Sequence, residues 1–325
     1  MHAQPRAFQV AEGEAHRRLD LFLADALRLS RAQARRLLAR GAVRVDGRLA
    51  ALAAKGTRLA PGATVEVAPF TRPEQQRPVP EPRAPLVVLA RGAGWIALDK
   101  PAGTPVHPLA EGEAGTLLGA LVAHHPELHG VGEGGLRSGV VHRLDVDTSG
   151  VLLFATREDR WRRLREAFRE RRVEKVYRAL VLGRPRAEGT TELGLVVARH
   201  RPARVRVVGA SEAAGSRAVR TATLSWRVLE LLGPATLVEV RPATGFLHQI
   251  RATFAHLGFP VAGDRLYGAA RDPTGAPRQM LHAARIAWED VAAASPDPAD
   301  FSAACARLRR AVAGEARSAG QADPP

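Results

Sequence analysis

The sequence predicts an α+β protein, in which a small N-terminal domain precedes a larger domain of mainly antiparallel strands with flanking helices. Residues 17–68 combine helical spacing of apolar residues with short strand patterns. Six prolines fall between residues 69 and 85, which is typical of an extended linker. From residue 86 to residue 292, apolar β-branched runs alternate with glycine and proline turns. We therefore expect domains at 17–68 and 86–292, joined by a linker at 69–85.

The charge of the chain favours a nucleic acid partner. The net charge is +15, and 45 of the 48 basic residues are arginines, since only three are lysines. A GC-rich genome alone can enrich arginine, but an excess of positive charge attracts polyanions whatever its origin. Arginine also forks onto phosphate and stacks on bases better than lysine does. An anionic membrane surface is the weaker alternative.

Several other classes are disfavoured. No apolar run approaches membrane-spanning length, and the first residues lead into no signal-peptide-like stretch. The single Cys305 excludes a disulfide within the chain and a cysteine-cluster metal site. The glycines between 130 and 135 lack the context of a nucleotide-binding loop. We expect a cytoplasmic monomer without membrane contact, metal or other cofactor.

In the small domain, apolar residues recur at helical spacing from Leu19 to Leu27. Ser30 and Gln33 form a capping box that starts a second helix, which ends at Gly41. The pair Asp46-Gly47 predicts a hairpin turn, and residues 64–67 predict another short strand.

Arginines are dense in this domain. Residues 17–48 contain nine arginines and three aspartates, a net charge of +6. Four of the arginines gather around the second helix, namely Arg28, Arg31, Arg35 and Arg36. A solvated helix face is the plain alternative, but such a face usually carries acids as well, and the second helix has none. The pattern therefore favours a surface that follows RNA phosphates.

In the large domain, strands are expected at 86–90, 95–98, 173–181, 193–197, 205–208, 218–231, 236–241 and 285–288. Helices are expected at 157–172, whose eight arginines outnumber four acids, and from residue 247 onward. The arginine-rich helix is a candidate for a second RNA-facing surface. After residue 293 we expect a disordered tail that holds at most one short helix around 301–312.

The stretch from Gly139 to Ala155 is the centre of the large domain. Two apolar runs, Val140-Val141 and 151–155, enclose a polar loop that contains Asp145. A loop fixed at both ends by buried strands can hold a carboxylate rigidly at a surface. The alternative is an ordinary turn of Asp, Thr and Ser with a solvated ion pair.

The motifs of the chain resolve this choice. The string HRLD-x-x-TSG at 142–150 resembles the signature of the RluA-type pseudouridine synthases. Further family motifs are K-P-x-G-x-x-V-H-P at 100–108, E-K-x-Y-x-A-x-V at 174–181, T-G-x-x-H-Q-I-R at 244–251 and G-x-P-x-x-G-D-x-L-Y-G at 258–268. Residues 18–67, with R-L-D-x-F-L and V-x-V-D-G, resemble the alpha-L RNA-binding module, named from a ribosomal protein.

The resemblance implies a mixed, mainly antiparallel catalytic sheet and the conversion of uridine to pseudouridine in RNA, without a cofactor. It implies that Asp145 acts at the sugar, either as nucleophile or as base, that Tyr177 contacts the uracil and that Arg251 pairs with Asp145. We expect Arg143 to fill the space that the flipped base leaves. Other expected RNA-binding residues of this domain are His142, Thr148, His248 and Gln249.

Two alternative functions remain at this point. A non-catalytic RNA-binding or ribosome-assembly protein on the same fold would be expected to lack Asp145 or Tyr177, and both are present. A glycosidase-like hydrolase would use Asp145 with Asp147. The alpha-L module favours ribosomal RNA over transfer RNA as the target. The chain departs from the family at Phe246, where a basic residue is usual.

Overall fold

The computed structural model describes residues 5–200, 203–209, 212, 216 and 218–320. The chain divides into two compact units. The first runs to Arg77 and includes Gly134–Leu136, and the second comprises Pro78–Glu133 and the chain from Arg137 onward.

The small domain packs two helices, α1 (Leu19–Leu27) and α2 (Arg31–Ala39), with a four-stranded antiparallel sheet. The strand order is β1 (Arg6–Gln9), β4 (Thr64–Val67), β2 (Val43–Val45) and β3 (Arg48–Leu49). Short 3₁₀ helices lie at Glu12–Glu14, Leu52–Gly56 and Pro73–Gln75. The capping box is confirmed, because the Ser30 hydroxyl accepts from the Gln33 amide and Gln33 Oε1 accepts from the Ser30 amide. Strand β1 precedes the expected boundary at residue 17.

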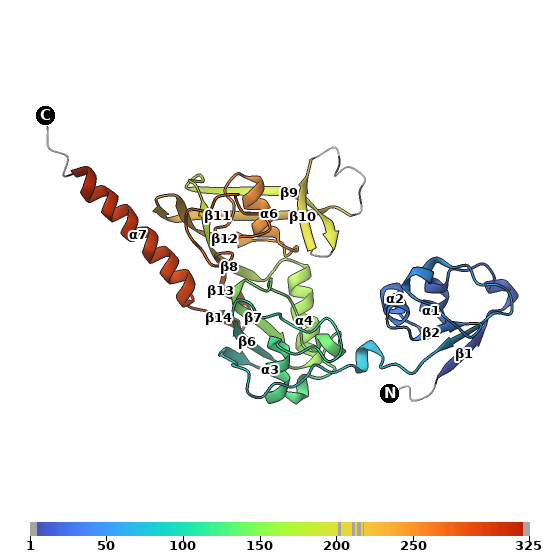
Figure 1. The fold of residues 1–325 in the computed structure, drawn as a ribbon. Coiled ribbons are helices and arrows are strands. Elements are labelled where there is room, and N and C mark those ends of the chain that lie inside the picture. The colour runs from blue at the N-terminus through green and yellow to red at the C-terminus, as the bar shows by residue number, and fades with distance from the viewer. Residues whose placement is uncertain (1–4, 201–202, 210–211, 213–215, 217, 321–325) are drawn as a thin grey trace. The chain divides into compact units, whose positions relative to one another are not determined.

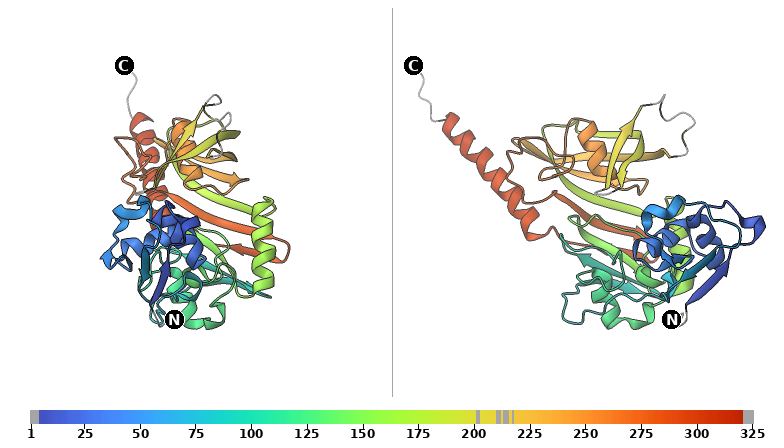
Figure 2. Two further views of the ribbon diagram at one scale, coloured as in Figure 1. Left: turned by 90° about the vertical axis from the view of Figure 1, so that its right-hand side faces the viewer. Right: turned by 45° about the vertical axis from the view of Figure 1, so that its right-hand side comes forward.

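The large domain is built on a ten-stranded mixed sheet, so the predicted fold class is confirmed. Its order is β10 (Ala203–Val208), β9 (Glu188–His200), β11 (Arg220–Leu232), β12 (Ala235–Pro242), β8 (Glu174–Leu182), β13 (Leu281–Trp288), β7 (Ser149–Ala155), β6 (Trp95–Lys100) and β5 (Val88–Gly92), with β14 (Val291–Ala294) paired to β13. All pairings are antiparallel except that of β13 with β7. Figure 2 shows the long strands β8 and β13 running between the two halves of this sheet.

Each half of the sheet carries a helix on each face. In the β5–β7 half, α3 (Leu117–His124) and α4 (Glu158–Arg169) cover opposite faces, because alternate residues of β6 and β7 enter two separate cores. In the β8–β12 half, α6 (Gln249–His256) covers one face and α7 (Ala299–Gly320) the other. Short 3₁₀ helices lie at Pro126–Leu128 and Gly135–Arg137. Figure 1 labels these helices beside their strands.

The parallel contact between β7 and β13 depends on a glycine. Gly150 has a φ of +110°, and a Cβ atom built on it would lie 2.2 Å from the carbonyl oxygen of Ala283. Only glycine adopts this conformation without strain and leaves room for the second backbone. The start of β7 is therefore fixed where the polar loop 142–149 ends.

The linker and the tail differ from the sequence expectations. The second half of the expected linker belongs to the large domain, since the Glu81 carboxylate accepts from the amides of Gly115 and Thr116, just before α3. The tail is not irregular where it is described: it completes β14 and forms α7, in which Phe301, Ala304, Cys305 and Leu308 are buried. Those four positions share one helix face, so they dock α7 on the sheet. Residues 321–325 of the expected tail lie outside the described residues.

Among the described helices, none combines the length and the apolar character needed to cross a bilayer.

Candidate active site

The loop that carries Asp145 is held by buried groups from distant parts of the chain. Asp145 opens a turn, in which its carbonyl accepts from the Thr148 amide at 3.1 Å. Lys100 is fully buried at the end of β6, and its Nζ donates to three carbonyl oxygens, those of Pro101, Thr104 and Val146, at 2.7–2.8 Å. All three ammonium protons of Lys100 are thus used in fixing backbone. Lys100, which belongs to the motif at 100–108, therefore stabilises the backbone beside the loop.

Arg251 joins Asp145 to a second carboxylate. Its Nη1 donates to Asp145 Oδ2 at 2.8 Å, while its Nε and Nη2 fork onto Asp264 at 2.6 and 2.9 Å. Helix α6 presents the guanidinium, of which 9% is exposed, to the 20% exposed Asp145. Burial by itself raises the pKa of Asp264, but Arg251 and two backbone amides outweigh burial and lower it. The predicted Asp145–Arg251 pair is present, and Asp264 holds the guanidinium through its other two nitrogen atoms.

His248 faces the other oxygen of Asp145. Its Nε2 lies 3.9 Å from Asp145 Oδ1, and its Nδ1 lies 3.0 Å from the hydroxyl of Tyr267. That hydroxyl accepts from the Val205 amide at 2.7 Å, so we assign its proton to His248 Nδ1 and the ring proton to Nε2. Burial lowers the pKa of His248 despite the charge of Asp145, which keeps the ring neutral. His248 also has a left-handed backbone with φ +52°, a strained conformation of the kind found at functional sites.

Tyr177 lies in β8, where it is paired in register with Ala283 of β13 and Val240 of β12. Burial, and then the negative charge of Asp145, raise the pKa of Tyr177 above its ordinary value. The hydroxyl therefore stays protonated near the carboxylate. Its side chain packs against the apolar cluster that includes Ile250 of α6, the residue before Arg251 in sequence.

Three residues that we expected to contact RNA form hydrogen bonds within the protein instead. His142 Nε2 accepts from the Leu153 amide at 3.0 Å, and its ring stacks on Phe168. The Thr148 hydroxyl is buried and accepts from Gln279 Nε2 at 2.8 Å. Gln249 is also buried, and its amide group bonds Thr244, the Phe246 amide and the Thr223 carbonyl. In each case the polar groups satisfy buried backbone or side chains, which the motif string alone does not reveal.

Arg143 remains available. It is exposed and makes no hydrogen bond or ion pair within the described part of the chain. Phe246, the departure from the family pattern, packs against the apolar cluster that includes Leu195, Val205 and Ala222. This position therefore contributes to the core between α6 and β10.

The arginines of the small domain are organised by one buried acid. The carboxylate of Asp20 is fully buried and accepts from Arg18, Arg31 and Arg35 at 2.8–3.2 Å. Burial alone raises the pKa of Asp20, but the three guanidinium groups lower it to about 2. Three positive charges on one negative charge leave an excess of two, and the guanidinium groups stay partly exposed.

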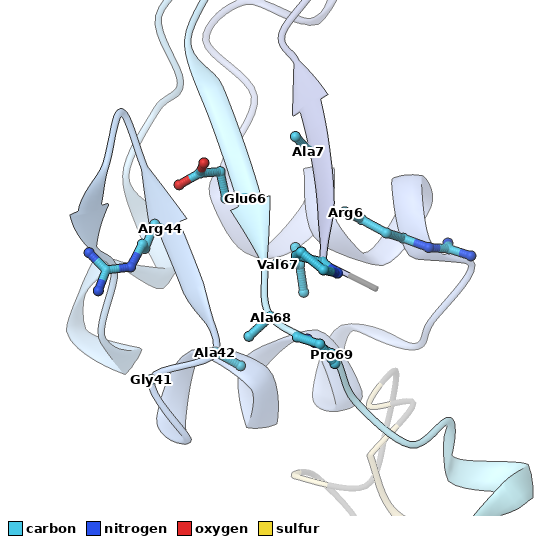
Figure 3. A pocket seen from close by; sticks show the side chains of 10 residues that line it. Arg6, Ala7, Gly41, Ala42, Arg44, Glu66, Val67, Ala68 and Pro69 are labelled. Atoms are coloured by element: carbon cyan, nitrogen blue, oxygen red, sulfur yellow. The ribbon is translucent and has the colours of Figure 1, made fainter. Parts of the chain in front are cut away.

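Two more arginines of the predicted phosphate surface, Arg28 and Arg36, are exposed. Arg28 ends α1 in a left-handed conformation. A groove of about 360 Å³ on the same domain, between β1, β4 and β2, is lined mainly by small and apolar residues (Figure 3). None of the four arginines around α2 lines this groove.

The arginine-rich helix α4 is less available for RNA than its composition indicates. Four arginines in α4 or just after it form ion pairs with glutamates. They are Arg162, Arg163, Arg169 and Arg172, and their partners are Glu158, Glu166, Glu170 and Glu289. Arg163 and Arg172 also lie over the ring of Trp288. This expected RNA surface is largely a solvated network of ion pairs.

No group of three or more His, Cys, Asp or Glu side chains in the described ranges is arranged to hold a metal ion.

Sequence reasoning missed several residues of the site. Asp264 and Tyr267 fall within a quoted motif, G-D-x-L-Y-G, without an expected role. Arg278, Gln279 and His282 hold the Asp145 loop through Asp147, Thr148 and Ser149. For His282, the sequence offered the string Leu281-His282-Ala283 as a signal. The hydrogen-bond partner of His282 is Ser149, which lies 133 positions away, so the string alone does not indicate the contact.

Comparisons with known proteins support the predicted family. Residues 94–256 match the family model described as RNA pseudouridylate synthase, and residues 17–54 match the S4 domain. An uncharacterized RNA pseudouridine synthase of Chloroflexus aurantiacus is 37% identical over 327 residues, which cover 95% of each chain. Ribosomal large subunit pseudouridine synthase D of Xanthomonas campestris pv. campestris is 33% identical over 92% of this chain and 91% of its own.

Among solved structures, human RNA pseudouridylate synthase domain containing 1 superposes with a TM-score of 0.55 at 26% identity, over 69% of this chain and 90% of its own. The predicted family is thereby confirmed. The chain belongs to the RluA-type RNA pseudouridine synthases, which are isomerases, and carries an N-terminal S4 domain that supports RNA as its partner.

Proposed function

We propose that this protein converts specific uridines of large-subunit ribosomal RNA to pseudouridine, with Asp145 as the catalytic carboxylate. The observation that carries the proposal is the contact of 2.8 Å between Arg251 and Asp145 Oδ2, which leaves Oδ1 of Asp145 directed to the side of His248. A carboxylate held at one oxygen by a fixed cation is oriented for chemistry at the other.

The reaction requires only rearrangement of the nucleotide. The bond between uracil nitrogen 1 and the ribose anomeric carbon breaks, the uracil rotates, and its carbon 5 bonds to the anomeric carbon. Carbon 5 then loses its proton, and nitrogen 1 gains one, so no atom enters or leaves overall. Asp145 Oδ1 serves either as nucleophile at the anomeric carbon or as base at the adjacent ribose carbon, and both roles need an ionised oxygen. The neutral Nε2–H group of His248 lies beside that oxygen as a hydrogen-bond donor for the bound nucleotide.

Tyr177 serves this reaction as a neutral phenol. Because burial and Asp145 raise the pKa of Tyr177, a phenolate base is disfavoured. Its ring can cover a face of the uracil, as base-binding aromatic side chains do. Removal of the target base from its stack costs a few kcal/mol. Arg143 is exposed and lies in the same loop as Asp145, so we assign it to the space that the base leaves.

The RNA target rests on the relatives. Four relatives that are 33–36% identical to this chain are named ribosomal large subunit pseudouridine synthase D. The Asp20-centred arginines, together with Arg28 and Arg36, provide positive charge that suits contacts with RNA phosphates in addition to the catalytic domain.

The chemical proposal is tested with Asp145→Asn and Asp147→Asn. The two changes remove equal charge from one loop, but only Asp145 contacts Arg251. Asp145→Asn should abolish tritium release from RNA labelled at carbon 5 of uridine, with RNA affinity within a few-fold of the wild type, whereas Asp147→Asn should retain the rate. Residual turnover of Asp145→Asn above about one hundredth of the wild-type rate would refute the catalytic role.

The target is tested by a pseudouridine map of total RNA from cells with and without the protein. Loss of pseudouridine confined to large-subunit ribosomal RNA is expected, and loss confined to transfer RNA would contradict the proposal. Free uracil as the product, sensitive to Asp147→Asn, would favour the hydrolase alternative. Unchanged maps with altered ribosome assembly would favour the non-catalytic alternative.

A further inference from the structure

Two basic side chains donate hydrogen bonds to successive carbonyl groups of the turn that begins at Asp145. The first is the carbonyl of Val146, which accepts from Lys100 Nζ at 2.7 Å and from the Gly103 amide. The second is the carbonyl of Asp147, which accepts from Arg278 Nη1 at 3.0 Å. Val146 and Asp147 are the central residues of the turn, so their carbonyls define the direction in which the turn leaves Asp145.

Arg278 connects this turn to the C-terminal helix. Its Nη2 donates to the Ser149 hydroxyl at 3.1 Å, and its Nε and Nη2 fork onto the Asp300 carboxylate at 2.6 and 3.0 Å. The Arg278 side chain is only 10% exposed. One guanidinium therefore bonds the end of the turn, the start of β7 and α7, and its planar shape allows these bonds at the same time.

Asp300 is itself fixed by the packing of α7. It is the second residue of the helix, and its Oδ1 accepts from the Phe301 amide at 2.8 Å. The next turns bury Phe301, Ala304, Cys305 and Leu308 against the cluster that includes Leu180 and Met280. The carboxylate that holds Arg278 is thus tied to the core, although it is 37% exposed itself.

We propose that Arg278, held by Asp300 at the start of α7, is a positioning residue that sets the turn from which Asp145 reaches the ribose. Neither Arg278 nor Asp300 bonds the Asp145 carboxylate, so they act through backbone geometry. The inference rests on the proposed catalytic role of Asp145, and it extends the functional machinery to the C-terminal helix. A displacement of about 1 Å in a reacting group can cost about a hundred-fold in rate.

The test compares two ion pairs that attach α7 to the rest of the domain. Asp300→Asn removes the charge that holds Arg278 but keeps an oxygen for the Phe301 amide. Glu230→Gln removes the charge that pairs with Arg309 of α7 at 2.6 Å. Among the described residues, neither Glu230 nor Arg309 bonds the Asp145 loop, so this variant serves as the matched control. Arg278→Lys keeps the positive charge but cannot reproduce the fork.

The readouts are the single-turnover rate at saturating large-subunit ribosomal RNA labelled with tritium, and the dissociation constant for the same RNA. We expect Asp300→Asn and Arg278→Lys to lower the rate about ten- to a hundred-fold, with the dissociation constant within two-fold of the wild type. Glu230→Gln should retain the wild-type rate. Arg278→Lys supplies the test independently if Asp300→Asn does not fold.

Three results would overturn the inference: wild-type rates for both Arg278→Lys and Asp300→Asn, an equal loss of rate in Glu230→Gln, or a loss that appears only as weaker RNA binding. Failure of the inference is distinct from failure of the proposed function. If Asp145→Asn is inactive while Asp300→Asn and Arg278→Lys match the wild type, only the positioning role falls. If Asp145→Asn is active, the proposed function itself falls.

Discussion

Replacement of Arg251 by leucine should affect stability and catalysis for separate reasons. The guanidinium is nearly buried between two carboxylates, of which Asp264 is fully buried. Arg251→Leu removes two bonds to Asp264 and one to Asp145. Asp264 then remains as a buried charge with only the amides of Leu266 and Tyr267 as partners.

The size of the stability effect follows from that burial. Removal of one partner of a buried ion pair costs about 3–5 kcal/mol, chiefly because the remaining charge is left unpaired. For a domain of this size, each kcal/mol lowers the melting temperature by about 2–4 °C. We therefore expect Arg251→Leu to lower the midpoint of the large domain by about 6–20 °C.

The double variant Arg251→Leu with Asp264→Asn separates the two effects. Asparagine keeps an oxygen for the amides of Leu266 and Tyr267 but carries no charge, so most of the lost stability should return. The single-turnover rate should remain at least about a hundred-fold below wild type in both variants, because Asp145 still lacks its partner.

Circular dichroism melts at pH 7 and tritium release from saturating RNA measure the two quantities. An unchanged midpoint in Arg251→Leu would show that the pair is not a buried electrostatic unit. A double variant that recovers both stability and rate would show that Arg251 is needed only to neutralise Asp264. Either result would refute the reasoning.

Other predictions concern separate parts of the chain. The pKa of Asp20 is lowered to about 2, so its ion pairs contribute stability that is fully present above pH 4 and is lost as the pH falls through 2. The difference in melting temperature between wild type and Asp20→Asn should therefore be constant at pH 5–7 and shrink below pH 4. Gly150→Ala should yield little folded protein by circular dichroism, since its Cβ would meet the Ala283 carbonyl, and a wild-type melt would contradict this. Arg36→Glu should reduce the slope of log affinity against log salt by roughly 0.7–0.9 in filter binding, and an unchanged slope would remove Arg36 from the RNA surface.

The sequence was sufficient where a local string encodes both chemistry and position. The motif around Asp145 and the motif that contains Arg251 each specify a residue type, and the family resemblance implied their pairing across 106 positions. The capping box at Ser30 was predicted from local pattern alone and is confirmed, because its two hydrogen bonds span only three residues.

The sequence was insufficient where a polar residue has two possible uses. Thr148 and Gln249 stand inside functional motifs, yet their side chains satisfy buried groups, and the partners Gln279 and Thr223 lie far away in sequence. The arginines of α4 were expected to contact RNA, but several of them form ion pairs within the protein. Some partners, such as Glu289, come from another element of the fold. Composition counts charges, but availability to RNA depends on which charges the fold brings together.

The C-terminal segment shows why composition also misled us about order. Averaged over residues 293–325, alanine, proline and charged residues dominate, and this average predicts disorder. A helix needs only one apolar stripe to dock, and Phe301, Ala304, Cys305 and Leu308 provide it within eight residues. The same docking places Asp300 against Arg278. A segment with so short a stripe can therefore matter to the turn that begins at Asp145, since it fixes the position of the carboxylate that pairs with Arg278.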